Sequence, residues 1–216
     1  ADMAAAFPTQ EEFFQAQQQR HGEKLQQKFS SARAAVCGLG GLGSNIAICL
    51  ARAGVGHLHL IDFDRVDLSN LHRQQHAAAQ IGMYKTDALK ETLEAISPYI
   101  QLQTDTIRMT EENLGELLEH DSIICEAFDN AQAKAMLVNS VLELFPDKYI
   151  IAGSGMAGIG SGNCIMTRKI TPRFYLCGDE KSDVADTPGL LSSRVMLCAA
   201  HQAHTVLRIL AGETEA

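Results

Sequence analysis

A glycine-rich turn between a short apolar run and a helical pattern constrains this chain most. Residues 33–37 (RAAVC) are apolar, Gly38-Leu39-Gly40-Gly41-Leu42-Gly43 follows at once, and residues 44–53 have helical spacing. In this G-x-G-x-x-G pattern the first glycines let backbone N–H groups approach a phosphate, and the last lets the helix pack against the strand. Residues 57–62 (HLHLID) then alternate as a strand does. The sequence therefore predicts a parallel βαβ unit that binds a nucleotide.

The alternation of strand and helix patterns continues to Gly153. Helices are predicted over 82–96, 110–120 and 131–145, and strands over 100–107, 122–127 and 148–152. Short antiparallel strands are expected over 163–170 and 173–177, and a closing amphipathic helix over 190–210. We predict an α/β fold, a Rossmann-like, largely parallel sheet flanked by helices, with short antiparallel strands near the C-terminus. No linker divides it: residues 1–30 form a helical arm and residues 31–216 one domain.

Composition and charge exclude several classes of protein. The 216 residues carry 18 Lys and Arg against 26 Asp and Glu, a net charge of −8, and no basic stripe for nucleic acid appears. No apolar run reaches the ~20 residues that cross a bilayer. The first residues lack a basic, then apolar, secretion signal, so we expect a cytoplasmic protein with reduced thiols. The six cysteines include no C-x-x-C pair, and we expect no zinc.

Charged residues downstream of the glycine loop indicate which nucleotide is bound. Asp62 ends the second strand, where a carboxylate grips ribose hydroxyls. Arg73 and Lys85 then add cations that a triphosphate needs and a dinucleotide does not. Asp129 follows the strand at 122–127, at the sheet edge where open α/β sheets bind ligands, and is a natural Mg²⁺ ligand there. The glycine loop alone would suggest NAD, and these residues instead favour ATP.

Four motifs in order resemble those of a known family. They are GLGGLGS, IDFDRVDLSNLHRQ, the lysine of IGMYKTDALK, and EAFDN. The chain resembles the ThiF/MoeB/HesA superfamily of ubiquitin-activating-enzyme relatives over about residues 20–210. Its length and the segments MAGIGSGN, FYLCGD and AAHQAH look most like the compact ThiF-like group of thiamine biosynthesis. The resemblance implies an ATP-dependent adenylyltransferase that activates the C-terminal glycine of a small ubiquitin-fold sulfur carrier.

The same resemblance implies roles for individual residues. The nucleotide would contact the glycine loop, Asp62 and the segment after it, through Gly38, Gly40, Gly41, Gly43, Asp62, Ser69, Asn70, Arg73, Lys85 and Asn130. Asp129 would organise Mg²⁺, and Arg73 and Lys85 would act in catalysis. Arg20 would be donated across the interface of a homodimer. Cys177 lies where some relatives carry a persulfide-forming cysteine. Apart from the resemblance, the glycines around Met156 are expected to form a groove for the carrier's Gly-Gly tail, because glycine has no side chain.

Two other functions fit parts of the sequence. One is an NAD(P)-dependent Rossmann oxidoreductase, against which Arg73, Lys85 and Asp129 argue. The other is a non-catalytic module that only binds a carrier, against which the intact charged residues argue. The sequence also lacks the paired C-x-x-C motifs of many relatives, and we expect no appended sulfur-transfer domain, so the resemblance does not establish later sulfur transfer.

Overall fold

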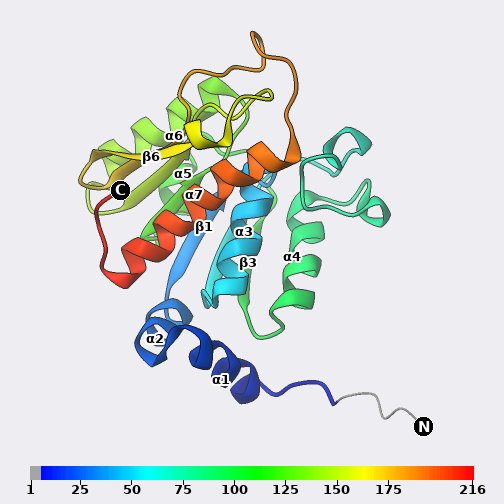
Figure 1. Cartoon of the computed structure of the whole chain (residues 1–216), viewed down its shortest axis with the longest axis vertical. Helices are drawn as coiled ribbons and strands as arrows, with labels where there is room; N and C mark the ends of the chain where they lie inside the picture. The colour runs from blue at the N-terminus through cyan, green and yellow to red at the C-terminus, as the bar shows by residue number, and fades with distance from the viewer. Residues whose placement is uncertain (1–5) are drawn as a thin grey trace.

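One mixed sheet organises the chain in a computed structural model that describes residues 6–216 (Figure 1). The strand order is β3-β2-β1-β4-β5-β7-β6, and every neighbouring pair is parallel except β6–β7. The strands are β1 (Arg33–Cys37), β2 (His57–Ile61), β3 (Gln101–Asp105), β4 (Ile123–Glu126), β5 (Tyr149–Gly153), β6 (Met166–Thr171) and β7 (Phe174–Gly178). This confirms the predicted α/β fold, including the antiparallel strands near the C-terminus.

Helices cover both faces of the sheet and enclose two apolar cores. α3 (Gly41–Ala53), α4 (Lys85–Ile96) and α7 (Ser192–Ala211) pack on one face, where Ile46, Leu50 and Val206 are buried. α5 (Leu114–Leu117) and α6 (Ala131–Leu144) pack on the other, around Leu137 and Val141. Short 3-10 turns lie at Leu68–Asn70, Ala78–Gln80 and Gly162–Cys164. Within residues 6–216 no helix is long and apolar enough to span a membrane.

Two helices are shorter than their sequence patterns predict. The helix expected from residue 82 begins at Lys85, because Gly82 has a positive φ of 90° and Tyr84 forms an antiparallel bridge with Arg65. The helix expected over 110–120 is helical only at Leu114–Leu117. Thr110 and Asn113 each bond the other's backbone N–H through their side chains, and this turn occupies the residues before α5. Local side-chain bonds thus replace regular helix.

Two helices precede the sheet at the amino ends of its strands. α1 (Gln10–His21) begins at a capping box between Thr9 and Glu12, and α2 (Glu23–Ser30) buries Phe29. In Figure 1 both lie at the bottom of the molecule, below β1. They fall within the helical arm predicted over 1–30, of which residues 1–5 lie outside the described residues.

A buried histidine joins the strands through two carboxylates. His59 on β2 is fully buried, and its Nδ1 and Nε2 each lie 2.6 Å from a carboxylate oxygen, of Asp121 and Asp105 respectively. Arg33 Nε bonds the second oxygen of Asp121 at 2.6 Å. Burial alone would lower the pKa of His59, but the carboxylates, Asp121 above all, raise it above the ordinary 6.5. An imidazolium satisfies both carboxylates, because only that form has two N–H donors.

His59→Gln is therefore expected to destabilise the protein in a pH-dependent way. A group whose pKa is raised on folding contributes its full stability below its unfolded pKa and loses it as pH rises through the folded pKa. The loss of unfolding free energy should be about 1–3 kcal/mol at pH near 6 and should shrink toward pH 9. Urea titrations across this range measure it, with His57→Gln on the same strand as the control. A loss that grows with pH would contradict a charged His59.

Candidate functional site

A cavity of about 710 Å³ lies at the carboxyl ends of the central parallel strands. Its volume is in the range of small-molecule sites. One part is walled by the glycine loop and the residues after β2 and β3, including Gly41, Asp62, Phe63 and Arg108. Another part is walled by two loops and α7, through Ser154, Gly155, Met156, Ala157, Ser182, Asp183, Val184, Leu190 and Val195. Asp129, Asn130 and Lys134, at the start of α6, complete the lining.

The glycine loop connects β1 to α3 with no room for side chains at two positions. Gly38 has a φ of 91°, and a Cβ there would lie 2.8 Å from the Ala127 carbonyl oxygen. A Cβ on Gly43 would lie 1.6 Å from the Gly38 carbonyl oxygen. These contacts explain the glycines at both ends of the motif. Because α3 begins at Gly41, its unpaired N–H groups face the cavity, as in a phosphate site.

Asp62 is held in place by backbone N–H groups of the glycine loop and of the segment that follows β2. It is buried at the end of β2, and its two carboxylate oxygens accept hydrogen bonds from the N–H groups of Leu39 at 2.7 Å and Asp64 at 2.8 Å. A carboxylate oxygen can accept two hydrogen bonds, and each oxygen of Asp62 accepts one within the protein. Asp62 lines the cavity, so it has capacity left for ligand hydroxyls.

Two of the predicted cations reach the cavity. Lys85, 7% exposed, is the first residue of α4 and lies 3.7 Å from Asp64. Arg73 packs its aliphatic stem beside Gly41, where a Cβ would come within 3.5 Å of it, and its Nη1 donates to the Ser69 carbonyl at 3.2 Å. Asn45 of α3 donates to the carbonyl of Arg73 at 3.3 Å and fixes that backbone against α3.

Three of the other predicted site residues make hydrogen bonds that shape a turn or cap a helix. The Asn70 side chain accepts from Asp67 N–H at 2.9 Å, and Ser69 donates to the Asp67 carboxylate, so the two shape a 3-10 turn and do not line the cavity. Asn130 caps α6 by accepting from Ala133 N–H at 3.0 Å, although it also lines the cavity. Asp129 is exposed there.

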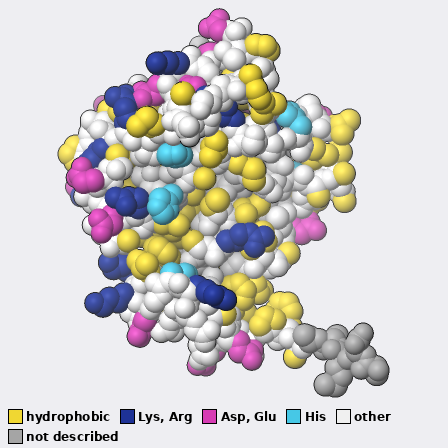
Figure 2. Space-filling view, viewed as in Figure 1, with side chains coloured by type: hydrophobic (Ala, Val, Ile, Leu, Met, Phe, Trp, Pro, Cys, Tyr) yellow, Lys and Arg dark blue, Asp and Glu magenta, His cyan; other side chains and the backbone are white. Residues whose placement is uncertain are grey.

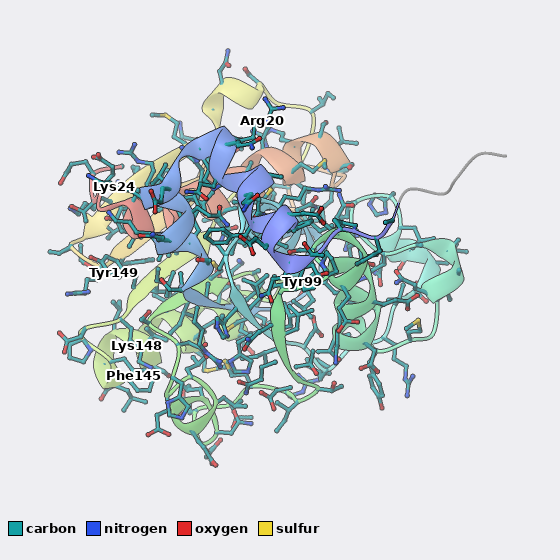
Figure 3. The ribbon with its side chains drawn as sticks, turned by 90° about the horizontal axis from the view of Figure 1, so that it is seen from below. Arg20, Lys24, Tyr99, Phe145, Lys148 and Tyr149 are labelled. Atoms are coloured by element: carbon teal, nitrogen blue, oxygen red, sulfur yellow. The ribbon has the colours of Figure 1, made fainter. Side chains whose placement is uncertain are left out.

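Arg20 and Cys177 lie away from the cavity. Arg20 is exposed on α1, and Figure 3 shows it at the end of the molecule that faces away from the carboxyl ends of β1 and β2. Within one chain it does not line the cavity. Cys177 is fully buried on β7, and burial raises the pKa of its thiol to about 11 although Thr167 and Thr205 bond it. Such a thiol is a poor nucleophile and is closed to a protein partner.

Sequence reasoning missed several lining residues, among them Lys134, Arg108 and Gln74. Lys134 lies 3.1 Å from both oxygens of the buried Glu126 and donates to the Gly153 carbonyl at 3.0 Å. Arg108 stacks its guanidinium 4.0 Å from the centre of the Phe63 ring. Gln74 lines the cavity with a buried Oε1 that has no hydrogen-bond partner in the structure. The sequence did contain a signal for Lys134, because it lies one helical turn after Asn130 and so on the same side of the predicted helix.

Comparison with known proteins places the chain in a family. Residues 14–216 match the ThiF family. The chain belongs to the ThiF family. It is 41% identical over 113 residues to a molybdopterin-synthase adenylyltransferase of Haemophilus influenzae, covering 52% of this chain and 46% of that protein. It is 29% identical over 193 residues to the adenylyltransferase and sulfurtransferase UBA4 of Lodderomyces elongisporus, covering 87% and 42%. This ThiF-family chain thus spans less than half of either relative.

Solved structures of this fold support the same architecture. The tRNA N6-threonylcarbamoyladenosine dehydratase TcdA of E. coli, in complex with ATP, superposes with a TM-score of 0.82 at 22% identity, over 93% of this chain and 94% of that one. MccB of E. coli with ATP gives a TM-score of 0.70 at 21% identity, over 88% and 59%. At these identities the likeness shows a shared fold.

Proposed function

We propose that this ThiF-family protein is an ATP-dependent adenylyltransferase that activates the C-terminal glycine of a small ubiquitin-fold sulfur carrier. The observation that carries the proposal is the cavity itself. It joins a phosphate-type glycine loop and Asp62 to Arg73, Lys85 and Asp129 at one sheet edge. The unpartnered Oε1 of Gln74 supports a polar ligand there. The names of the relatives and the ATP complexes of proteins with this fold agree with the proposal.

The cations of the cavity favour ATP over NAD(P). Arg73, Lys85 and Arg108 all line it, and a triphosphate offers each a charged partner, whereas Lys134 already pairs with Glu126. A dinucleotide needs mainly the glycine loop and Asp62. An oxidoreductase therefore leaves these charges unexplained, and so does a module that only binds a carrier.

The residues present fit a magnesium ion. In nucleotide sites Mg²⁺ is held by one or two carboxylates together with substrate phosphates. Asp129 offers such a carboxylate, exposed at the cavity. Among residues 6–216 no cluster of three or more metal-binding side chains occurs, so the phosphates would supply the remaining ligands. Bound there, the ion would neutralise charge on the leaving pyrophosphate. The absence of zinc and the cytoplasmic location stay predictions from the sequence.

The chemistry assigned to the chain is positioning and charge stabilisation. The carrier's C-terminal carboxylate attacks the α-phosphate, a new P–O bond forms, and the bond to pyrophosphate breaks. Asp62 orients the ribose, and the first N–H groups of α3 contact phosphate oxygens. Arg73 and Lys85 neutralise the charge that develops on the transferred and leaving groups. Adenylate formation needs no protein nucleophile, so the buried Cys177 takes no part in this step.

The carrier tail would occupy the part of the cavity that the loops after β5 and β7 form. Gly155, Met156 and Ala157 of the loop after β5 line this part of the cavity and would lie against an extended Gly-Gly peptide. The sequence segments of the compact group favour a thiamine-type carrier, whereas a molybdopterin-synthase enzyme is among the relatives. Assays should therefore offer both carrier types.

Ligand-induced stabilisation tests the nucleotide class directly. ATP with Mg²⁺ at about 100 times its Kd should raise the free energy of unfolding by about 2.7 kcal/mol, whereas NADH should leave Tm unchanged. Thermal melts with each ligand measure this. A carrier–adenylate, trapped as a hydroxamate after addition of hydroxylamine, then identifies the activated group. Stabilisation by NADH and not by ATP would overturn the proposal in favour of the oxidoreductase.

A homodimer is proposed because α7 exposes apolar side chains. Met196 and Leu197 are 43% and 42% exposed, and Figure 2 shows hydrophobic side chains spread over this face. In such a dimer Arg20, remote from its own cavity, would serve the partner's.

Mixing two inactive variants tests whether Arg20 acts across the dimer. Arg20→Ala and Arg73→Ala should each abolish adenylation alone. After equal mixing, half of the dimers are hybrids with one complete site, so about a quarter of the wild-type activity should return. Subunit exchange is checked by native mass spectrometry of tagged chains. No recovery after confirmed exchange would show that Arg20 acts within its own chain or not at all.

A further inference from the structure

Arg194 joins two loops that wall one part of the cavity. It lies in the first turn of α7 and is 5% exposed. Its Nη1 donates to the Ala157 carbonyl at 2.6 Å and its Nε to the Gly160 carbonyl at 3.0 Å, both in the first loop (154–162). Its Nη2 lies 2.8 Å from a carboxylate oxygen of Asp179, which begins the second loop (179–191). One guanidinium therefore holds both loops.

Asp179 fixes the second loop around this ion pair. Its other carboxylate oxygen accepts from the N–H groups of Lys181 at 2.9 Å and Ser182 at 2.8 Å. Burial would raise the pKa of Asp179, but these N–H donors and Arg194 hold it far below its ordinary range. Ser182 Oγ in turn accepts from Ala157 N–H at 3.1 Å, which ties the second loop back to the first.

The two loops approach each other closely because glycines separate them. A Cβ on Gly155 would lie 2.1 Å from the Asp179 carboxylate, and one on Gly158 would lie 2.3 Å from Thr187. Gly158 N–H also donates to the Gly189 carbonyl at 2.8 Å. Figure 1 shows the second loop, drawn in orange before α7, at the top of the molecule. The loops thus form one wall whose inner side faces the cavity.

The position of Arg194 is not explained by the stability of α7. A cation in the first turn of a helix opposes the helix dipole, and a buried charge is costly unless paired. The four acceptors that Arg194 contacts all lie in the loops: Ala157, Gly160, Asp179 and Ser182. The arrangement therefore stabilises the loops rather than the helix.

We propose that Arg194 is a positioning residue for the acyl substrate, an extended peptide C-terminus, because it sets the spacing of the two loops against which that peptide lies. The inference rests on the proposed function. ATP occupies the other part of the cavity, at the glycine loop and Asp62. Loosening the loops therefore weakens peptide binding and leaves nucleotide binding intact.

Arg194→Lys tests the assignment, because lysine keeps the charge beside Asp179 but cannot hold the Ala157 and Gly160 carbonyls as well. The KM for the carrier in ATP–pyrophosphate exchange should rise about 10-fold or more. The Kd for ATP should stay within about 2-fold, as should kcat at saturating carrier. Ser182→Ala, a milder change in the same cluster, should shift the KM in the same direction. Arg168→Lys is the matched control, since Arg168 pairs with Glu180 of the same loop at the exposed surface.

Limited proteolysis gives a readout that needs no turnover. Lys181 is exposed in the second loop, and its N–H is held by Asp179. Trypsin should cut after Lys181 faster in Arg194→Lys than in wild type or in Arg168→Lys, and a peptide ending in Gly-Gly should slow cleavage of the wild type. The inference is overturned if the carrier KM is unchanged, or if it rises together with the Kd for ATP. Wild-type protein without carrier-dependent exchange would instead contradict the proposed function, and the inference with it.

Discussion

Asp129→Asn is expected to lower the rate of adenylate formation by about 100-fold or more while the protein stays folded. Asparagine keeps the shape of the side chain and its hydrogen bonding, and Asp129 is exposed at the cavity, so Tm should change little. What is lost is the carboxylate proposed to anchor Mg²⁺ beside the phosphates. ATP should still bind, because the glycine loop, Asp62 and Lys85 are unchanged. Exchange kinetics at several Mg²⁺ concentrations, with ATP binding by calorimetry, measure both effects.

The control for this variant is Asp147→Asn, because Asp147 is also exposed and lies in the turn between α6 and β5. It should keep wild-type exchange. Near wild-type exchange by Asp129→Asn at low Mg²⁺ would show that the metal role is assigned to the wrong residue. Loss of ATP binding together with exchange would mean that Asp129 contacts the nucleotide itself.

Lys134→Met is expected to cost about 3–5 kcal/mol of unfolding free energy, because it leaves the buried Glu126 carboxylate without its counter-ion. Glu126 is fully buried at the end of β4, and burial raises the pKa of its carboxyl although Lys134 opposes the shift. With Lys134 gone, the Glu126 side chain keeps backbone hydrogen bonds, such as that from the N–H of Phe128 at 2.7 Å, but loses the cation that pairs with it. Urea unfolding at neutral pH measures the loss.

A second substitution separates the unpaired charge from the lost packing. Glu126→Gln in the Lys134→Met background removes the charge and should restore most of the stability. Lys90→Met serves as the surface control, since Lys90 and Glu94 form an exposed pair 3.9 Å apart that is worth at most about 0.5 kcal/mol. If the Lys134→Met protein is as stable as the Lys90→Met protein, the Lys134–Glu126 ion pair does not stabilise the fold as proposed.

The parts of the fold that follow from local pattern were predictable from sequence. Alternating polar and apolar residues and short apolar runs predicted the strands to within a few residues. The glycine loop predicted where the cavity lies. The length of α5 was not predictable from periodicity, because Thr110 and Asn113 form a local turn that competes with helix. Residue 82 was placed in α4 by pattern, while its positive φ excludes it.

The site was predictable where a motif places a residue at a strand end, as for Asp62 and Asp129. Arg108 and Arg194 were not, because their roles depend on contacts across the fold, with Phe63 and with Asp179. Spacing within a motif also did not distinguish Asn70, which caps a turn, from Arg73, which lines the cavity. For Cys177 the residue pattern predicted a position on a strand but not its complete burial.

ATP–pyrophosphate exchange with and without a carrier tests the central claim most directly, because the carrier's carboxylate is the proposed nucleophile. Labelled pyrophosphate should enter ATP only when a ubiquitin-fold carrier with a free Gly-Gly terminus is present, and a carrier with an amidated terminus should give no exchange. Thiamine-type and molybdopterin-type carriers are both tried. Exchange that persists without any carrier, or that is absent with every carrier of either type, would contradict the account.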